Sequence, residues 1–280
     1  MPQPRSRGRA RTRRMERRNS GSDLAARIIS ALPAIAFAIA IVWAGGIVWT
    51  LGLIALGLVC LHELYGMFDR AHPARLAGFL GLIGMLLAAH YGGREDLLLA
   101  LVLTIPLTFF LVVAQRRGGA PAVSVTVLGV VWIGLALGHA VLLRDLPHGN
   151  AIVIDVLVGT FLGDTGAYLG GRMFGVRKLA PRISPNKTVE GLAFGIVFAT
   201  GAVWFAGLYA DWLSGVDALI LGAAVAVAAP LGDLFESYLK RDAGTKDTGR
   251  LFGPHGGALD RLDATLFTAV VGFYVWQAML

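Results

Sequence analysis

Ionisable side chains gather in one segment that follows a long apolar run ending near residue 231. Residues 232–263 contain six carboxylates, five basic side chains and one imidazole. Carboxylate oxygens suit Mg²⁺, which often takes one or two of them together with substrate phosphates. Lys and Arg bind the remaining phosphate oxygens. The segment therefore predicts a site for a polyphosphate and its metal. Its ionisable residues are Asp233, Glu236, Lys240, Arg241, Asp242, Lys246, Asp247, Arg250, His255, Asp260, Arg261 and Asp263.

The spacing of residues within this segment favours a functional site over a charged loop that is merely exposed to solvent. Asp260 and Asp263 are three residues apart at an expected helix start, so they share a face. Gly256 and Gly257 let backbone N–H groups approach a phosphate closely beside His255. A charge run usually only keeps a loop in water, but ionisable groups within or beside membrane spans are functional by default.

A second polar segment, residues 163–191, offers a weaker signal. Asp164 lies near the end of an apolar stretch, and Ser184 and Lys187 precede the next one. Thr188 followed by Glu190 is typical of a helix N-terminus, which attracts phosphate. By themselves these residues favour an ordinary capped helix with a snorkelling lysine.

The elements that must position these residues are membrane-spanning helices. The chain of 280 residues is 56% hydrophobic and 15% charged, with a mean hydropathy of +0.67, whereas soluble domains are about 25% charged. A span needs roughly 17–25 mostly apolar residues. The sequence therefore predicts an all-α, polytopic integral membrane bundle of about nine transmembrane helices. The predicted spans are 25–44, 46–67, 76–91, 97–114, 121–143, 151–170, 189–210, 215–235 and 262–280.

The distribution of positive charge predicts the orientation. With the N-terminus in the cytoplasm, 23 of the 25 basic residues lie on the inner side, as the positive-inside rule requires. We therefore expect a multi-pass protein of the cell inner (plasma) membrane. Residues 1–24 are expected to form an Arg-rich, disordered cytoplasmic tail, residues 25–150 the N-terminal transmembrane helices, and residues 151–280 the catalytic region. The longest connectors, 171–188 and 236–261, then face the cytoplasm.

Two further features carry weaker predictions. The arginine tail lies next to a span, which favours contact with anionic lipid over nucleic acid. Glu63 and Asp155 fall inside predicted spans. We expect Asp155 to be paired or to face a cavity, and Glu63 to pair within the bundle or to help hold a lipid headgroup.

The two polar segments together resemble the phosphatidate cytidylyltransferase (CDP-diacylglycerol synthase) family over about residues 160–265. The arginine tail is not part of the family pattern. Upstream elements of the resemblance are Gly163–Thr165, and Ser184 and Pro185 through to Gly191. The residues that match the family signature are Ser237, Lys240, Arg241, Lys246, Asp247, His255, Gly256, Gly257, Asp260, Arg261 and Asp263.

The resemblance implies a nucleotidyltransferase of phospholipid biosynthesis that converts CTP and phosphatidic acid to CDP-diacylglycerol and pyrophosphate and requires Mg²⁺. The expected partners are CTP, phosphatidic acid and membrane lipid, without nucleic acid, and a homodimer is left open. The expected metal ligands are Asp233, Asp247, Asp260 and Asp263. The expected catalytic residues are Asp260, Lys240, Arg241, Lys246 and His255. The expected substrate-binding residues are Ser184, Lys187, Arg261, Gly256, Gly257 and Asp164.

Two alternatives remain at this point. A related CTP-dependent membrane enzyme, such as a polyprenol or phytol kinase, would phosphorylate a lipid alcohol. A transporter would carry ions on Glu63, Asp155 and Asp164, but the sequence has no visible repeat of the kind common in transporters.

Overall fold

The computed structural model describes residues 39–249 and 256–280. The chain divides into two compact units, Met1–Trp43 and Ala44–Leu280, and every element below belongs to the second. Within the described residues, eight helices are long and apolar enough to cross a membrane. The predicted polytopic helical bundle is therefore confirmed. The first predicted span, 25–44, lies almost entirely outside the described residues, as does the predicted tail, 1–24.

The bounds of the described helices follow the apolar stretches closely. The single span Gly119–Asp145 consists of an α-helix, a π-helical turn and a second α-helix. The elements are α2 (Gly46–Met67), η1 (Asp69–Ala71), α3 (Arg75–Gly92), α4 (Arg94–Gln115), α5 (Gly119–Gly129), η2 (Val130–Gly134), α6 (Leu135–Asp145), α7 (Gly149–Phe174), α8 (Val189–Gly207), α9 (Gly215–Asp242) and α10 (Leu259–Met279).

Local signals explain where several helices begin. A helix in lipid must satisfy its backbone polar groups internally or through caps. The Thr188 hydroxyl caps α8 by accepting a hydrogen bond from the Gly191 N–H at 3.1 Å, which confirms the helix start expected there. The Ser214 hydroxyl caps α9 in the same way, from the Asp217 N–H at 3.1 Å.

The four C-terminal helices, α7 to α10, pack against one another, and α10 also contacts α6 and α2 of the N-terminal half. Small residues allow the close helix approaches that are common in membrane bundles. On α7, a Cβ added at Gly166 would lie 2.6 Å from the Cβ of Phe198 on α8. Glycine at this position therefore lets the backbones of α7 and α8 approach each other.

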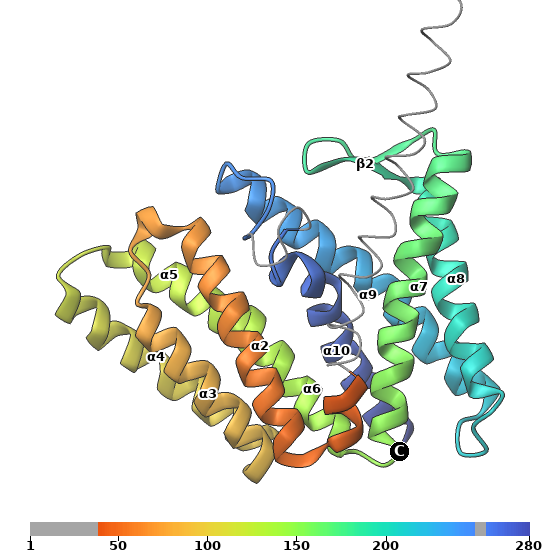
Figure 1. The fold of residues 1–280 in the computed structure, drawn as a ribbon, viewed down its shortest axis with the longest axis horizontal. Helices are drawn as coiled ribbons and strands as arrows, with labels where there is room; N and C mark the ends of the chain where they lie inside the picture. The colour runs from red at the N-terminus through yellow and green to blue at the C-terminus, as the bar shows by residue number, and fades with distance from the viewer. Residues whose placement is uncertain (1–38, 250–255) are drawn as a thin grey trace, which may run out of the picture. The chain divides into compact units, whose positions relative to one another are not determined.

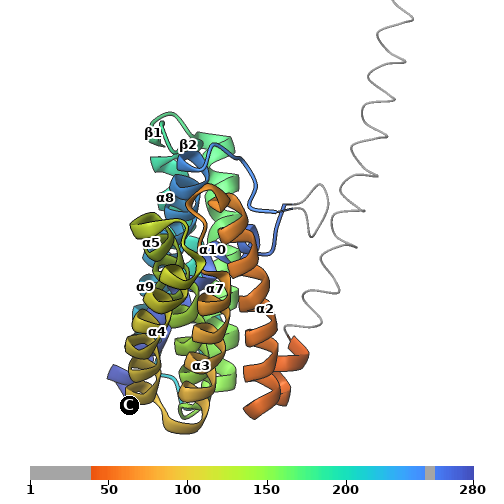
Figure 2. The ribbon, with the colours of Figure 1, turned by 90° about the vertical axis from the view of Figure 1, so that its left-hand side faces the viewer.

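One connector departs from the all-helical expectation. Within residues 171–188, strands β1 (Lys178–Ala180) and β2 (Ser184–Thr188) form a two-stranded antiparallel hairpin. The hairpin and the C-terminus lie at opposite ends of the bundle (Figure 1), and the view in Figure 2 agrees. The hairpin leads directly into α8 and so places the β2 side chains at one membrane boundary.

Helix α9 continues further than its apolar composition indicates. It ends at Asp242, whereas the predicted span ends near residue 235. The expected connector 236–261 is therefore helical in its first part. Because α9 ends and α10 begins at the same boundary as the hairpin, the two polar segments of the sequence come together there (Figure 1).

Candidate active site

The first cluster is built around Lys240, in the last turn of α9. Its ammonium group donates to Glu236 Oε2 at 2.6 Å and to Asp260 Oδ1 at 2.8 Å. Glu236 lies one helical turn earlier on α9, whereas Asp260 lies in the first turn of α10. One lysine thus joins the end of one span to the start of the next. Since the side chains of Lys240 and Asp260 are only 14% and 11% exposed, these ion pairs are weakly screened by water.

Asp260 also organises the connector between α9 and α10. Its Oδ2 atom accepts hydrogen bonds from the N–H groups of Thr248 at 3.0 Å and Gly257 at 2.8 Å. The Thr248 hydroxyl lies 3.0 Å from the same oxygen. Gly256 has a φ of +84°, a left-handed conformation that favours glycine. A carboxylate with this many donors is held in one orientation and holds the connector against α10.

Glu63, from α2, completes this cluster from the N-terminal half of the chain. Its carboxylate accepts hydrogen bonds from the N–H groups of Ala258 at 3.0 Å and Leu259 at 2.9 Å. The Thr248 hydroxyl lies 3.1 Å from Glu63 Oε2 and can therefore donate to either Glu63 or Asp260. Glu63 is only 7% exposed. Its negative charge is stabilised by backbone donors at the α10 N-terminus, where the helix dipole is positive.

The second cluster joins the hairpin to α9. Lys187, on β2, forms an ion pair with Asp233 Oδ2 at 2.6 Å, and the Ser237 hydroxyl donates to Asp233 Oδ1 at 3.2 Å. Asp164 on α7 and Asp263 on α10 lie within electrostatic range of Asp233 and of each other. Three carboxylates from three helices therefore lie near enough at this end of the bundle to influence one another electrostatically.

Close packing of α9 on α10 brings the two clusters together. A Cβ added at Gly232 would collide with the carbonyl oxygen of Asp263. The backbones of the two helices therefore touch beside Asp233 and Asp263. Glu236 is also within electrostatic range of Asp263 and Asp260.

The donor set of the two clusters has the chemistry that a divalent cation requires. Carboxylates outnumber the two lysine ammonium groups that contact them. Glu236 is 0% exposed, and its Oε1 atom has no hydrogen-bond partner among residues 39–249 and 256–280. No three His, Cys, Asp or Glu side chains among the described residues converge closely enough to enclose a metal by themselves. Mg²⁺ needs fewer protein ligands than that, because it uses waters and substrate phosphates as well.

The structure brings together most of the predicted site residues and leaves some at the surface. Asp164, Lys187, Asp233, Lys240, Asp260 and Asp263 belong to the two clusters, with Gly256 and Gly257 beside Asp260. The Gly257 N–H, which we expected near a phosphate, donates to Asp260 instead.

The remaining predicted residues lie around these clusters. Ser184 pairs with Ala180 at the start of β2. Arg241 is exposed and donates from Nε to the Ile183 carbonyl at 3.4 Å, so α9 also contacts the hairpin connector. Lys246, Asp247 and Arg261 are exposed. His255, like Arg250, lies outside the described residues.

Three residues of the two clusters were not among the catalytic, substrate-binding or metal-binding residues expected from the sequence. Glu236 was detectable, because it stands four residues before Lys240 on the same helix face. Thr248 and Glu63 could not be detected from the sequence, because they contact each other and other residues that are distant in the chain. Glu63 and Leu259, for example, are 196 residues apart. The expected pairing of Glu63 within the bundle is confirmed, and its partners are backbone N–H groups and a hydroxyl.

Comparisons with known proteins agree over nearly the whole chain. The model of the cytidylyltransferase family matches residues 25–279. A phosphatidate cytidylyltransferase of Brucella melitensis is 35% identical over 268 residues, which cover 92% of this chain and 94% of that protein. One of Bacillus subtilis is 33% identical over 258 residues, covering 88% and 94%. An uncharacterized protein of Escherichia coli is 38% identical over 185 residues, 62% of each chain.

Proposed function

This chain belongs to the cytidylyltransferase family, and we propose that it makes CDP-diacylglycerol from CTP and phosphatidic acid, releasing pyrophosphate. The observation that carries this proposal is the meeting of Lys187 and Lys240 with aspartates of three helices at one membrane boundary. Such a site can receive one anionic substrate from water and a second from the bilayer. Bacterial relatives and eight apolar helices in the described part indicate a multi-pass inner-membrane protein.

The reaction is a substitution at phosphorus. An oxygen of the lipid phosphate forms a bond to the α-phosphorus of CTP, the bond between that phosphorus and the bridging oxygen to the β-phosphate breaks, and pyrophosphate leaves. A phosphate monoester has a second pKa of about 6, so the attacking oxygen is ionised near neutral pH without a strong base. The barrier therefore lies mainly in charge repulsion and positioning.

The cationic side chains of the site address this repulsion. Lys187 and Lys240 each form an ion pair with an aspartate. When substrate binds, each ammonium group can also donate a hydrogen bond to a phosphate oxygen. Arg241, Lys246 and Arg261 are exposed at the same boundary and can bind the outer phosphates. Ser184, on the hairpin with Lys187, is proposed to close the site from the other side, and His255 to contact phosphate.

Mg²⁺ is part of this proposal. Asp233 and Asp263 would hold it, with Asp164 beside them, because these carboxylates repel one another in its absence. A bound Mg²⁺ would neutralise charge on the phosphate oxygens. Asp260, whose oxygens already face several protein donors, is better suited to position the connector. Asp247 as a ligand stays a prediction.

Purified full-length protein in detergent, given CTP, phosphatidic acid and Mg²⁺, tests the function. We expect pyrophosphate release in proportion to the lipid, and cytidine label in the lipid product. A CTP-dependent lipid kinase would instead leave the lipid unlabelled by cytidine and would need a lipid alcohol. Absence of cytidine from the lipid under all these conditions would overturn the proposal.

Mass photometry in nanodiscs checks the homodimer, which stays a prediction.

A further inference from the structure

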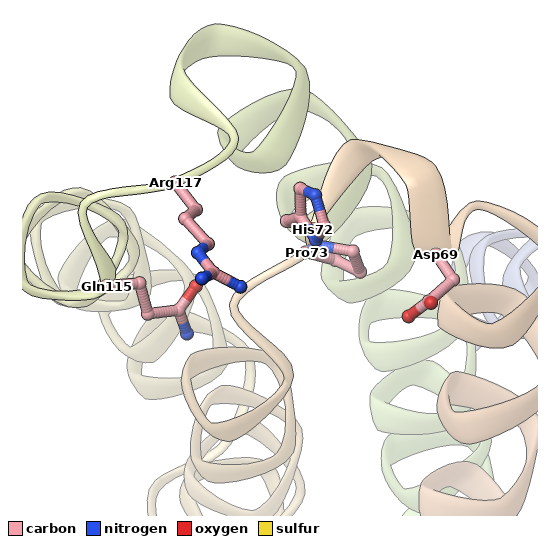
Figure 3. A pocket seen from close by; sticks show the side chains of 5 residues that line it. All are labelled: Asp69, His72, Pro73, Gln115 and Arg117. Carbon is pink, nitrogen blue, oxygen red and sulfur yellow. The ribbon is translucent and has the colours of Figure 1, made fainter.

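A polar surface cavity lies at the ends of the N-terminal helices. It has a volume of about 440 Å³ and is lined by Asp69, His72, Pro73, Gln115 and Arg117. Figure 3 shows Gln115 and Arg117 on one side of it, from the end of α4 and the following turn, and His72 and Pro73 on the other, before α3. None of these residues belongs to either active-site cluster.

The cavity has an excess of positive charge. Its carboxylate, Asp69, forms an ion pair with Arg75 at 2.8 Å. Arg117 makes no ion pair or hydrogen bond with any side chain that the structure describes. Arg70 and Arg116 flank the lining residues and are exposed. Residues 69–75 and 115–117 thus contain four arginines and a single carboxylate, and an arginine guanidinium is well suited to a phosphate.

The backbone around the cavity is shaped by two unusual turns that pack together. His72 and Arg116 have φ values of 52° and 54°, left-handed conformations that are uncommon for residues other than glycine. Between them, a Cβ added at Gly118 would lie 2.8 Å from the Ala71 carbonyl oxygen. The two turns are thus in contact, which fixes the backbone from which the lining side chains extend.

The surroundings of the cavity suit a lipid. Just along the helices from it, Leu76 on α3 and Phe110 and Val113 on α4 are 56%, 67% and 58% exposed. All three belong to helices apolar enough to span the membrane, so bilayer chains cover such side chains. A positively charged cavity at the boundary and an apolar helix surface next to it together match the two ends of one anionic phospholipid.

We propose that this cavity binds the headgroup of an anionic phospholipid, at a position separate from the active site. The phosphate contacts Arg117, with His72 and the Gln115 amide as further hydrogen-bonding groups, and the acyl chains lie along α3 and α4. This proposal does not depend on the catalytic one, since binding can be measured without CTP.

The experiment measures lipid binding to the full-length protein in a neutral detergent by native mass spectrometry. The probes are dioctanoyl phosphatidylglycerol, which is anionic, and dioctanoyl phosphatidylcholine, which has no net charge. Arg117→Gln should weaken phosphatidylglycerol binding about fivefold, the effect of one arginine near an anionic lipid surface. Arg94→Gln is the matched control, because Arg94 is exposed at the opposite end of α4 and does not line the cavity.

A second variant guards against a folding defect in the first. His72→Asn removes the imidazole while keeping a residue type that tolerates the left-handed conformation, and it should also weaken phosphatidylglycerol binding. Both variants should keep the wild-type turnover of CTP. Equal binding of the two lipids, or equal phosphatidylglycerol binding by wild type, Arg117→Gln and His72→Asn, would overturn the proposal. Displacement of the lipid by equimolar glycerol 3-phosphate would assign the cavity to soluble phosphates and would also overturn it.

Discussion

Lys240 and Glu63 show how single residues hold the site, each by partners on another helix. Lys240 neutralises Glu236 and Asp260, which are both largely buried. Glu63 receives the first N–H groups of α10. A buried charge without partners would destabilise a helical bundle. Both charges are stabilised here by partners that come together only when the connector between α9 and α10 has one particular orientation.

Replacing Lys240 with Met should reduce both activity and stability. The change leaves Glu236 and Asp260 without their shared cation, a loss of about 3–5 kcal/mol when one partner of a buried pair is removed. It also removes a cation from the reacting phosphates, which should lower kcat about 100-fold or more. CTP turnover and thermal unfolding in detergent measure the two effects. Lys178→Met, at an exposed position on β1, is the control, and wild-type turnover by Lys240→Met would contradict the assignment.

Glu63→Gln should act through position and not through contact with substrate. The amide can accept fewer of the hydrogen bonds from Ala258, Leu259 and Thr248, and an unsatisfied buried group costs about 1–3 kcal/mol. We expect a lower midpoint of thermal unfolding and a lower kcat with little change in the KM for CTP. Glu95→Gln, at an exposed helix start, provides the comparison. A variant that loses CTP affinity but keeps its stability would point to direct substrate contact instead.

At the scale of elements, the closeness of α9 and α10 decides where the aspartates lie. Gly232 permits backbone contact between the two helices next to Asp233 and Asp263. The hairpin β1–β2 then brings Lys187 to the same place. Glu190 holds the base of that hairpin, because its carboxylate accepts hydrogen bonds from the Val176 and Arg177 N–H groups at 3.0 and 3.1 Å.

Gly232→Ala should separate α9 from α10. The added methyl group meets backbone atoms of Asp263, which cannot rotate away, so overpacking of about 1–3 kcal/mol is expected. Activity should fall because the spacing of Asp233 and Asp263 changes. Gly201→Ala on α8 is the matched control, since a Cβ there meets no atom within 4 Å. Thermal unfolding and CTP turnover should change in the first variant and remain near wild type in the second.

At the scale of the whole molecule, alternation of the spans places both polar segments on one side of the membrane. We expect this side to be cytoplasmic, where CTP is available, because the basic residues concentrate there. Cys60 is the sole cysteine and is 0% exposed, so the wild-type chain should react little with maleimides.

Introduced cysteines therefore test the orientation directly. Ala120→Cys, at the start of α5, lies on the side of the active site, and Glu95→Cys, at the start of α4, lies on the opposite side. In intact spheroplasts a membrane-impermeant maleimide should label Glu95→Cys alone. Both variants should react after the membrane is permeabilised. Labelling of Ala120→Cys in intact spheroplasts would reverse the proposed orientation.

The sequence alone was sufficient for the membrane architecture. Apolar length predicts a span without knowledge of its neighbours, because lipid replaces the tertiary partners that a soluble helix requires. The eight described spans therefore lie close to their predicted bounds, apart from the longer C-terminal end of α9. The ionic segment also contains Lys240, Asp260 and Asp263, which the structure places in the two clusters.

Only the tertiary structure determined which partners the charged side chains of the site have. The sequence placed Asp260 among the metal ligands, which stays a prediction, and the structure adds that Asp260 accepts hydrogen bonds from Lys240, Thr248 and Gly257. The sequence left Glu63 without defined partners, and α2 brings that carboxylate to the α10 N-terminus. Both outcomes depend on contacts between residues far apart in the chain. A carboxylate's role follows from the donors that surround it, and those donors are determined by helix packing.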